Sequence, residues 1–313
     1  MIYGLNEDPS QYTLLPLVVH PSQMMNKKII YVRYGSLLVY GSFQPYHLSH
    51  MLMNALIPIE STLQKIPQQY SNVHVANVGR TLQSDAKYAF PIDFMGFEKQ
   101  FATVYFKPGA VDPYFSMPVF DGVTLKKMKD VTYCYPLGIL GVDGVCSRCF
   151  KEPTKEVYES LKQKVLKHYN IEDKVIQKRV LIVQRRETRK IVNLPKIISV
   201  VNEFSKDHQV VFLEDLTFPE QIKLFVECSI LIAPHGNGNS HIHWMRNGTV
   251  FIEGVGLRRY GEGFYGPLSR QKRIYYYSLP CSMKGCKESQ DPRDDDVYMD
   301  PEAVRKILKN HIH

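Results

Sequence analysis

Four cationic side chains fall within six residues directly after an apolar run at 180–184 (VLIVQ). They are Arg185, Arg186, Arg189 and Lys190. A guanidinium group binds phosphate oxygens through paired hydrogen bonds and stays charged throughout the physiological pH range. The cluster therefore predicts a clamp for a diphosphate. The alternative is a solvated loop that leads into the next helix, with Asn193 as the helix cap.

A second group of polar residues, Pro-His-Gly-Asn-Gly-Asn-Ser at 234–240, stands between a predicted strand and a predicted helix. Gly236 and Gly238 allow the backbone to approach a ligand closely, and the helix that follows offers N–H groups to an anion. His235 and Asn237 lie in the same turn. The spacing matches neither the dinucleotide-binding pattern GxGxxG nor a Gly-Lys-Ser/Thr phosphate loop.

The elements that would position these residues alternate regularly from about residue 153 onward. Strands that alternate with helices of 8–12 residues predict a parallel α/β sheet, and ligands bind such sheets at the carboxyl ends of the strands. Glu253 ends one of these strands, where it is either a ligand for ribose hydroxyls or a charge at an exposed strand end. We expect strands at 180–184, 209–213, 229–233 and 249–253. Helices are expected at 154–169, 195–206 and 301–313; a further helix begins at Thr217, and a short one ends at about Asn247.

The first half of the chain has a less regular pattern. The β-rich run at 29–43 predicts a hairpin around Gly35, and 47–64 predicts a helix kinked at Pro58. Short strands are expected at 72–78 and 101–107. Residues 108–152 have the Pro and Gly content of a connector with active-site loops.

The composition favours a globular protein with an anionic ligand. The chain has 313 residues, 44% of them hydrophobic, and a formal charge of +8. It contains no nucleic-acid-binding motif, so phosphate groups are expected as partners, not nucleic acid. Arg33 and Glu227 interrupt its longest apolar runs, so no transmembrane segment is expected. The first ten residues carry Glu7 and Asp8 and lack the pattern of a signal peptide.

The six cysteines leave three alternatives open. Cys146 with Cys149 and Cys281 with Cys286 could form a split zinc site, cysteines could form disulfides in an oxidising compartment, or the thiols could be reduced.

A hydrolytic metal site would draw on three other residues, His235, His241 and His243. His241 and His243 are two positions apart and lie on different faces of a helix, which argues against shared chelation of one ion.

The run at 213–253 (LEDLTFPEQIKLFVECSILIAPHGNGNSHIHWMRNGTVFIE) resembles the C-terminal signature of glycosyltransferase family 61. The match comprises a Phe-x-x-Gln helix, a strand, His-Gly-x-Gly and a further strand that ends in Glu. Residues 185–193 are similar to the family's Arg-x3-Arg-x-Ile-x-Asn motif. Tyr46-His47-x-x-His50 looks like its N-terminal His motif. The resemblance is strong over 178–280 and loose over 40–65.

The resemblance implies a GT-B-like α/β fold, in which two Rossmann-type lobes carry parallel sheets. An acceptor-side lobe is expected at 1–150, a nucleotide-sugar lobe at 151–290, and a tail with a closing helix at 291–313. The implied reaction is inverting transfer of N-acetylglucosamine or xylose from a UDP-sugar to a hydroxyl of a protein or oligosaccharide. The implied location is the ER or Golgi lumen if a leader or anchor is missing from this chain, and the cytoplasm otherwise.

The family motifs also imply roles for individual residues. Arg185 and Arg189 would hold the UDP diphosphate, and Asn193 would orient their loop at the donor site. Inverting transfer needs a general base near the acceptor hydroxyl, for which His47 and His50 are the candidates; a core or capping histidine is the alternative for each. The remaining donor-site residues would approach the phosphates, ribose or uracil: His235, Gly236, Asn237, Gly238 and Glu253.

No cofactor is expected, because arginines take the place of a divalent metal ion at the diphosphate. Residues 294–296 (Asp-Asp-Asp) are expected in a solvated tail loop.

Two departures from the family pattern bear on the activity. Asn237 and Asn239 stand where the family has Ala and Leu, and Met51 stands where an Asp usually follows the N-terminal His. If that Asp is the base in other members, this chain uses His50 instead or is catalytically impaired. The alternative function is thus a nucleotide-sugar- or glycan-binding protein of the same fold.

Overall fold

The structure is a computed structural model that describes residues 28–31, 35–40, 48–70, 72–77, 131–134, 136–140, 152–281 and 286–312. The chain divides into two compact units, Met1–His168 and Tyr169–His313. The border follows helix α5 (Lys155–His168), which therefore belongs to the first unit. The domain limits that the sequence suggests, at 150 and 290, stay a prediction.

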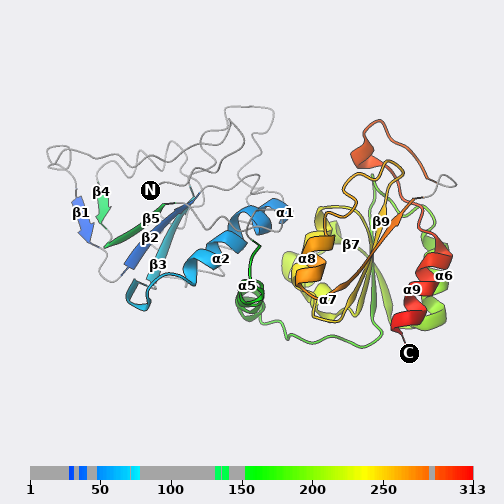
Figure 1. Ribbon diagram of the computed structural model, residues 1–313, viewed down its shortest axis with the longest axis horizontal. Helices are drawn as coiled ribbons and strands as arrows, with labels where there is room; N and C mark the ends of the chain where they lie inside the picture. The colour runs from blue at the N-terminus through cyan, green and yellow to red at the C-terminus, as the bar shows by residue number, and fades with distance from the viewer. Residues whose placement is uncertain are drawn as a thin grey trace. The chain divides into compact units, whose positions relative to one another are not determined.

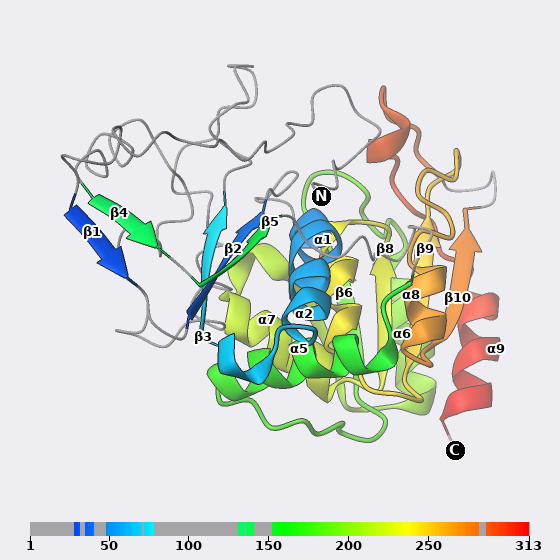
Figure 2. The same cartoon turned by 60° about the vertical axis from the view of Figure 1, so that its left-hand side comes forward.

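The strands of the first unit pair in parallel and do not form the hairpin expected at 29–43. Strand β1 (Lys28–Tyr31) pairs with β4 (Val131–Cys134). Strand β2 (Gly35–Tyr40) lies between β3 (Asn72–Asn77) and β5 (Leu137–Leu140), as Figure 2 shows. The hairpin prediction is wrong because β1 and β2 each have partners far along the chain, which local turn signals do not reveal.

The other strand predictions for the first unit had mixed outcomes. Strand β3 confirms the strand expected at 72–78. Strands β4 and β5 occupy part of the expected connector at 108–152, so that interpretation is wrong for them. The strand expected at 101–107 lies outside the described residues.

The helical segment expected at 47–64 connects β2 and β3. It consists of α1 (Leu48–Met51), a π-helical turn (Leu52–Leu56) and α2 (Ile57–Leu63), and a 3₁₀ turn (Gln68–Tyr70) follows. The π turn ends two residues before Pro58, which lacks an N–H and crowds the preceding helical turn. The helix expected to kink at Pro58 thus contains a π-helical turn just before the proline.

A buried carboxylate links α2 to α5 within the first unit. Glu60 is fully buried, and its Oε1 accepts hydrogen bonds from Ser160 Oγ at 2.5 Å and Lys164 Nζ at 2.9 Å. Its Oε2 accepts a second bond from Lys164 Nζ at 2.7 Å. A buried charge is tolerated only when it is paired and hydrogen-bonded. Lys164 therefore supplies the charge that allows this helix contact.

The second unit is built on a five-stranded parallel sheet in the order β10-β9-β8-β6-β7. This confirms the α/β fold class and the parallel sheet expected from the sequence. Strand β10 was not predicted from the sequence, because it lies at the edge of the sheet, where Tyr275 is exposed and Tyr276 and Tyr277 are only partly buried. The strands are β6 (Val180–Gln184), β7 (His208–Phe212), β8 (Ile230–Pro234), β9 (Val250–Val255) and β10 (Tyr275–Pro280).

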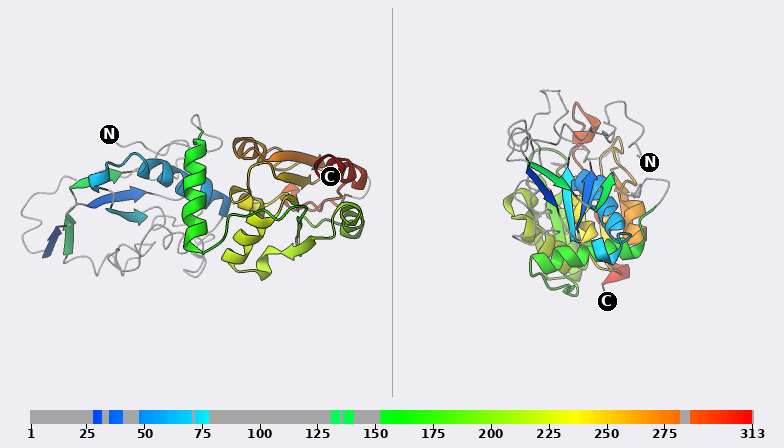
Figure 3. Two further views of the ribbon diagram at one scale, coloured as in Figure 1. Left: turned by 90° about the horizontal axis from the view of Figure 1, so that it is seen from below. Right: turned by 90° about the vertical axis from the view of Figure 1, so that its left-hand side faces the viewer.

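Helices cover both faces of this sheet. Helices α6 (Leu194–Phe204) and α9 (Pro301–His311) lie on one face, and α7 (Phe218–Glu227) and α8 (Gly266–Gln271) lie on the other (Figures 1 and 3). The central strands β6, β8 and β9 are buried along their whole length, in keeping with their largely apolar sequences; Gln184 and Glu253 are the polar exceptions. Short 3₁₀ helices occupy Leu213–Asp215, Asn237–His243 and Pro292–Asp294. In the described part of the chain, no helix is both long and apolar enough to cross a membrane.

The segment before α9 pairs with the loop that follows β6. Val297 forms a parallel bridge with Ile191, its N–H donates to Lys190 O at 2.8 Å, and Val192 N–H donates to Val297 O at 2.9 Å. The Lys190 N–H also donates to Asp296 Oδ1 at 2.8 Å. We call residues 294–299 the C-terminal strap, because they act as a short extra strand against this loop.

The strap corrects the expectation of a solvated loop at 294–296. Asp295 is 1% exposed, and it accepts hydrogen bonds from Arg258 Nε at 2.9 Å, from Arg258 Nη2 and from the Ser289 N–H at 3.0 Å. The hydrogen bonds from Arg258 lower the pKa of Asp295 to about 2. Asp294 and Asp296 are half-buried. The expectation is wrong because Arg258, distant in sequence, neutralises the central aspartate.

We expect Lys164→Met to lower the free energy of unfolding by about 1–2 kcal/mol, because it leaves the Glu60 carboxylate buried without its cationic partner. Lys167→Met is the matched control, since Lys167 is exposed on the same helix. Urea unfolding followed by circular dichroism measures both changes. Equal, small effects of the two substitutions would contradict the role given to Lys164.

We expect Asp295→Asn to destabilise the protein at neutral pH and to do so less as the pH falls. The folded-state pKa of Asp295 lies below the unfolded value of about 3.9. Its contribution is therefore complete above that value and is lost as the pH drops toward about 2. Urea midpoints of both proteins between about pH 7 and pH 3 test this. A difference that stays constant over this range would rule out the charge as its cause.

Candidate functional site

The side chain of Gln184 closes the loop that follows β6. Its Oε1 accepts hydrogen bonds from the N–H groups of Arg185 at 3.0 Å and Ile191 at 2.9 Å, and its Nε2 donates to Ile191 O at 3.1 Å. Gln184 is buried, so these bonds are shielded from water. Gln184 was not predicted from the sequence as a functional residue. The available signal was an amide at the end of an otherwise apolar strand.

Asn193 joins the other end of this loop to the C-terminal strap. Its Nδ2 donates to Met299 O at 2.7 Å, and its Oδ1 accepts from Met299 N–H at 3.1 Å. Asn193 is buried and stands at the N-cap position of α6, but its side chain does not cap that helix. Both of its polar groups are thus used to hold the arginine loop, residues 185–193.

The arginine loop directs Arg185 and Arg189 toward Gly236, after β8. A Cβ atom added to Gly236 would lie 2.6 Å from Arg185 Nη1 and 3.5 Å from Arg189 Nη1. Arg189 Nη1 is also 3.4 Å from His235 O. Arg189 has a φ of 57°, a left-handed conformation that is uncommon outside glycine. The backbone is therefore held in a particular shape that brings the two guanidinium groups together.

The two guanidinium groups are poorly compensated. Burial lowers the pKa of both, and the charge of Arg189 lowers the pKa of Arg185 further; the carboxylates of Asp294 and, for Arg185, Glu214 offset this only in part. The Nε of Arg189 is buried without a hydrogen-bond partner. Within the described residues, neither arginine forms an ion pair with a carboxylate. Such a site favours an anion with more than one charge.

Arg186 belongs to the same loop but faces away from this pair. Its Nη2 pairs with Asp215, its Nε lies 3.4 Å from Glu214 Oε1, and its guanidinium carbon lies 4.3 Å from the centre of the Phe212 ring. Arg186 is 53% exposed. Arg186 thus forms ion pairs with carboxylates, whereas Arg185 and Arg189 form none within the described residues.

His235 is oriented from behind by the buried carboxylate of Glu253. The Glu253 Oε1 lies 2.8 Å from His235 Nδ1 and accepts a hydrogen bond from Asn239 Nδ2 at 3.1 Å. Its Oε2 accepts from Tyr276 OH at 2.5 Å, and the carboxylate is 0% exposed. A carboxylate partner requires a proton on Nδ1, so Nε2 is the ring nitrogen left for other contacts. Burial and the proximity of Glu253 raise the pKa of Tyr276, which stays a hydrogen-bond donor.

The glycines of the turn allow close packing around His235. A Cβ at Gly238 would lie 2.5 Å from Leu213 Cδ1, and Gly236 O accepts a hydrogen bond from Tyr265 OH at 2.7 Å. Gly261, from the loop after β9, has a φ of 76°, and a Cβ there would lie 2.1 Å from His235 Nε2.

The partly buried Asn237 begins a 3₁₀ helix at Asn237–His243. This 3₁₀ helix replaces the short helix that was expected to end at about Asn247.

The structure thus brings together most of the predicted donor-site residues. Arg185, Arg189, His235, Gly236 and Glu253 meet at the carboxyl ends of β6, β8 and β9. Asn193 supports them through the strap. The structure does not describe the side chain of either predicted base. His47 lies outside the described residues, and His50 lies in α1 of the first unit.

The histidines proposed for a hydrolytic metal site do not converge. His241 Nδ1 accepts a hydrogen bond from Trp244 Nε1 at 3.0 Å, and its Nε2 contacts Gln221 Oε1 at 2.8 Å, so neither nitrogen has a lone pair to offer a metal. Burial lowers the pKa of His241 to about 3. The part of the chain that the structure describes holds no cluster of three metal-binding side chains.

The cysteines of the described part favour the disulfide alternative. Cys281 and Cys286 form a disulfide, and Cys228 is a free, buried thiol whose pKa burial raises to about 12. Cys146 and Cys149, the other half of the split zinc site, lie outside the described residues.

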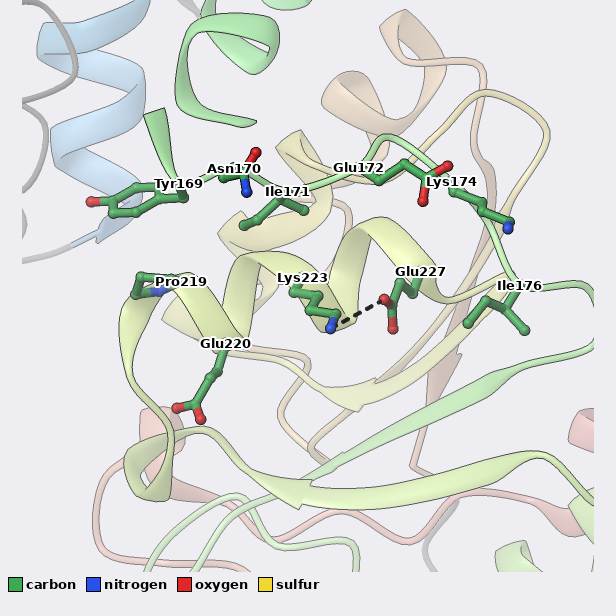
Figure 4. Close-up of a pocket in the computed structure, with 10 residues that line it drawn as sticks. All are labelled: Tyr169, Asn170, Ile171, Glu172, Lys174, Ile176, Pro219, Glu220, Lys223 and Glu227. Atoms are coloured by element: carbon green, nitrogen blue, oxygen red, sulfur yellow. Dashed lines mark ion pairs between the residues drawn. The ribbon is translucent and has the colours of Figure 1, made fainter. Parts of the chain in front are cut away.

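A separate groove of about 480 Å³ runs along α7 (Figure 4). It contains none of the predicted site residues, and its acidic and basic side chains are mixed, with Lys223 Nζ 3.8 Å from Glu227 Oε1. Its lining residues are Tyr169, Asn170, Ile171, Glu172, Lys174, Ile176, Pro219, Glu220, Lys223 and Glu227. The groove therefore lacks the concentrated positive charge of the arginine loop.

Comparison with known proteins identifies the family behind this arrangement. The family described as Glycosyltransferase 61 matches residues 48–252, which include the arginine loop and the His-Gly-Asn-Gly turn. A comparison with curated protein sequences returned no match. Since the family match covers more than half of the chain, the protein belongs to glycosyltransferase family 61, as the sequence motifs indicated.

Proposed function

We propose that the protein transfers a sugar from a UDP-sugar to a hydroxyl of a protein or oligosaccharide with inversion, and that the donor diphosphate binds between Arg185, Arg189 and Gly236. The carrying observation is the buried Arg189 Nε that has no hydrogen-bond partner, beside a second desolvated guanidinium. A diphosphate supplies both the acceptor atoms and the negative charge that this site lacks. N-acetylglucosamine and xylose are the leading sugars.

The arginine pair has a direct role in the proposed chemistry. When the bond between the sugar C1 and the diphosphate oxygen breaks, the bond electrons stay with UDP, which gains negative charge. Fixed cations at that position stabilise the transition state more than the ground state. Two guanidinium groups meet this need, so we propose that no divalent metal ion or other cofactor is required.

His235 and Glu253 have different roles in this proposal. His235 lies beside the phosphates or the ribose in this proposal, with Gly261 packed against its Nε2. Glu253, predicted from the family pattern to contact the ribose or uracil, has both oxygens occupied by His235, Asn239 and Tyr276. We therefore propose that Glu253 positions the imidazole and that Asn237 and Gly238 shape the turn beside the phosphates.

The remaining parts of the proposal follow the family resemblance. We propose a GT-B-like arrangement in which the second unit is the donor lobe and the first is the acceptor lobe. His47 or His50 is then the general base that takes the proton of the acceptor hydroxyl. The Cys281–Cys286 disulfide supports work in an oxidising compartment such as the ER or Golgi lumen.

We expect Arg189→Ala to weaken UDP binding by about 2 kcal/mol or more, because it removes a charged hydrogen-bonding partner. UDP at about 100 times its dissociation constant should stabilise the parent by about 2.7 kcal/mol, which raises the melting temperature by a few degrees. Calorimetric titration and thermal unfolding, with and without UDP, measure these effects.

Arg186→Ala is the matched control for this experiment. It removes the same charge from the same loop, but its side chain faces Asp215 and Phe212, so UDP binding should be nearly unchanged. Equal losses in both variants would indicate a general charge effect, and unchanged affinity in Arg189→Ala would refute the placement of the diphosphate. UDP binding without sugar transfer from any donor would favour the non-catalytic binding protein, which Met51 suggests.

We also expect Gly236→Ala to reduce UDP affinity by roughly tenfold, about 1.4 kcal/mol, because the methyl group would displace Arg185 Nη1. The guanidinium is the end of a flexible side chain, so the melting temperature without ligand should change little. Gly138→Ala is the control, since a Cβ at Gly138 meets no atom within 4 Å. Parent-like UDP titration curves for Gly236→Ala would show that Arg185 is not needed where the structure places it.

A further inference from the structure

Tyr260 presents an aromatic ring to solvent at the edge of the candidate site. Tyr260 and Tyr275 are the exposed large hydrophobic residues in the described part of the chain, at 47% and 55%. The ring of Tyr275 packs against His311, with 4.8 Å between ring centroids. The ring of Tyr260 lies 6.0 Å from that of His235, at an angle of 76° between the planes. Tyr260 is therefore the exposed aromatic residue that adjoins the donor-site residues.

The loop after β9, residues 256–265, is anchored on both sides of Tyr260. Arg258 pairs with Asp295 of the C-terminal strap, and Tyr265 OH donates to Gly236 O at 2.7 Å. Between these anchors, Gly261 lies directly against the imidazole of His235, as its positive φ and missing side chain allow. The anchors of the loop thus set the position of Tyr260 beside His235. Burial of the Tyr260 ring is not needed to hold it there.

Tyr260 and Arg189 both adjoin His235. Arg189 Nη1 donates to the His235 carbonyl oxygen at 3.4 Å, and the ring of Tyr260 lies 6.0 Å from the imidazole ring. The guanidinium of Arg189, the imidazole of His235 and the ring of Tyr260 therefore border one region. A ligand whose diphosphate sits on the arginines has its adjoining groups within reach of Tyr260.

We propose that the ring of Tyr260 is the surface on which the nucleobase of the donor stacks. This inference rests on the proposed binding of a UDP-sugar. A nucleobase offers a flat π-face that matches an exposed tyrosine ring, and base–aromatic stacking contributes measurably to affinity while tolerating different bases. The arginine pair binds the charge of the donor, and Tyr260 distinguishes a nucleotide from a bare diphosphate.

The test compares two anions that share the diphosphate and differ in the nucleoside. Calorimetric titration of UDP and of inorganic pyrophosphate is carried out with the parent, Tyr260→Leu and Tyr260→Phe, and with Tyr275→Leu as the matched control. Tyr260→Leu should bind UDP roughly tenfold more weakly, whereas Tyr260→Phe keeps the ring and should stay within about twofold. Pyrophosphate affinity should be unchanged in all variants, and Tyr275→Leu should bind both anions like the parent.

Several results overturn the inference. Parent-like UDP affinity in Tyr260→Leu excludes stacking, and an equal loss for UDP and pyrophosphate makes Tyr260 part of the diphosphate site instead. A loss seen for UDP-N-acetylglucosamine but not for UDP places the sugar, not the base, on the ring.

Failure of the proposed function gives a different pattern. A parent that does not bind UDP, or an Arg189→Ala variant that binds UDP and pyrophosphate like the parent, overturns the diphosphate site and this inference with it. A parent that binds UDP through Arg189, with no effect of Tyr260→Leu, overturns only the stacking surface.

Discussion

Two like charges, on Arg185 and Arg189, are held close together and partly out of water above Gly236. Left to themselves, the side chains would separate and hydrate. The surrounding structure prevents this, because Gln184 closes the loop at one end and Asn193 and the C-terminal strap fix it at the other. The free energy that holds the cations in position comes from these buried hydrogen bonds, so a ligand does not have to organise the site when it binds.

His235 is also fixed in position before a ligand binds, in this case by the carboxylate of Glu253. Glu253 is buried among three donors, and their hydrogen bonds stabilise a carboxylate that would otherwise be costly to remove from water. The arginine loop follows β6 and the His235 turn follows β8, whereas Glu253 lies in β9, between β8 and β10 in the sheet. A parallel sheet brings such residues together because all its carboxyl ends lie at one edge.

The sequence predicted the parts that depend on local pattern. The apolar run at 180–184 indicated a strand buried on both faces, and the cations after it indicated a loop at the ligand-binding edge. The strap and the pairing of Arg258 with Asp295 were missed, since each depends on partners that are far away in sequence. Gln184 was missed although its partners, Arg185 and Ile191, are near in sequence, because a single amide at a strand end does not indicate which backbone groups it will bind. The hairpin expected at 29–43 failed for the same reason: β propensity identifies a strand, but not the strand with which it pairs.

The long reach of the strap has a consequence for how the protein is made. Asn193 is bonded to a residue 106 positions later in the chain. During synthesis the arginine loop emerges well before the strap, so the two cations remain without their fixed geometry until the ribosome has added more than a hundred residues. The central strands can assemble earlier, but the anion site is completed late. A nascent chain therefore acquires its fold in large part before it acquires a defined place for its ligand.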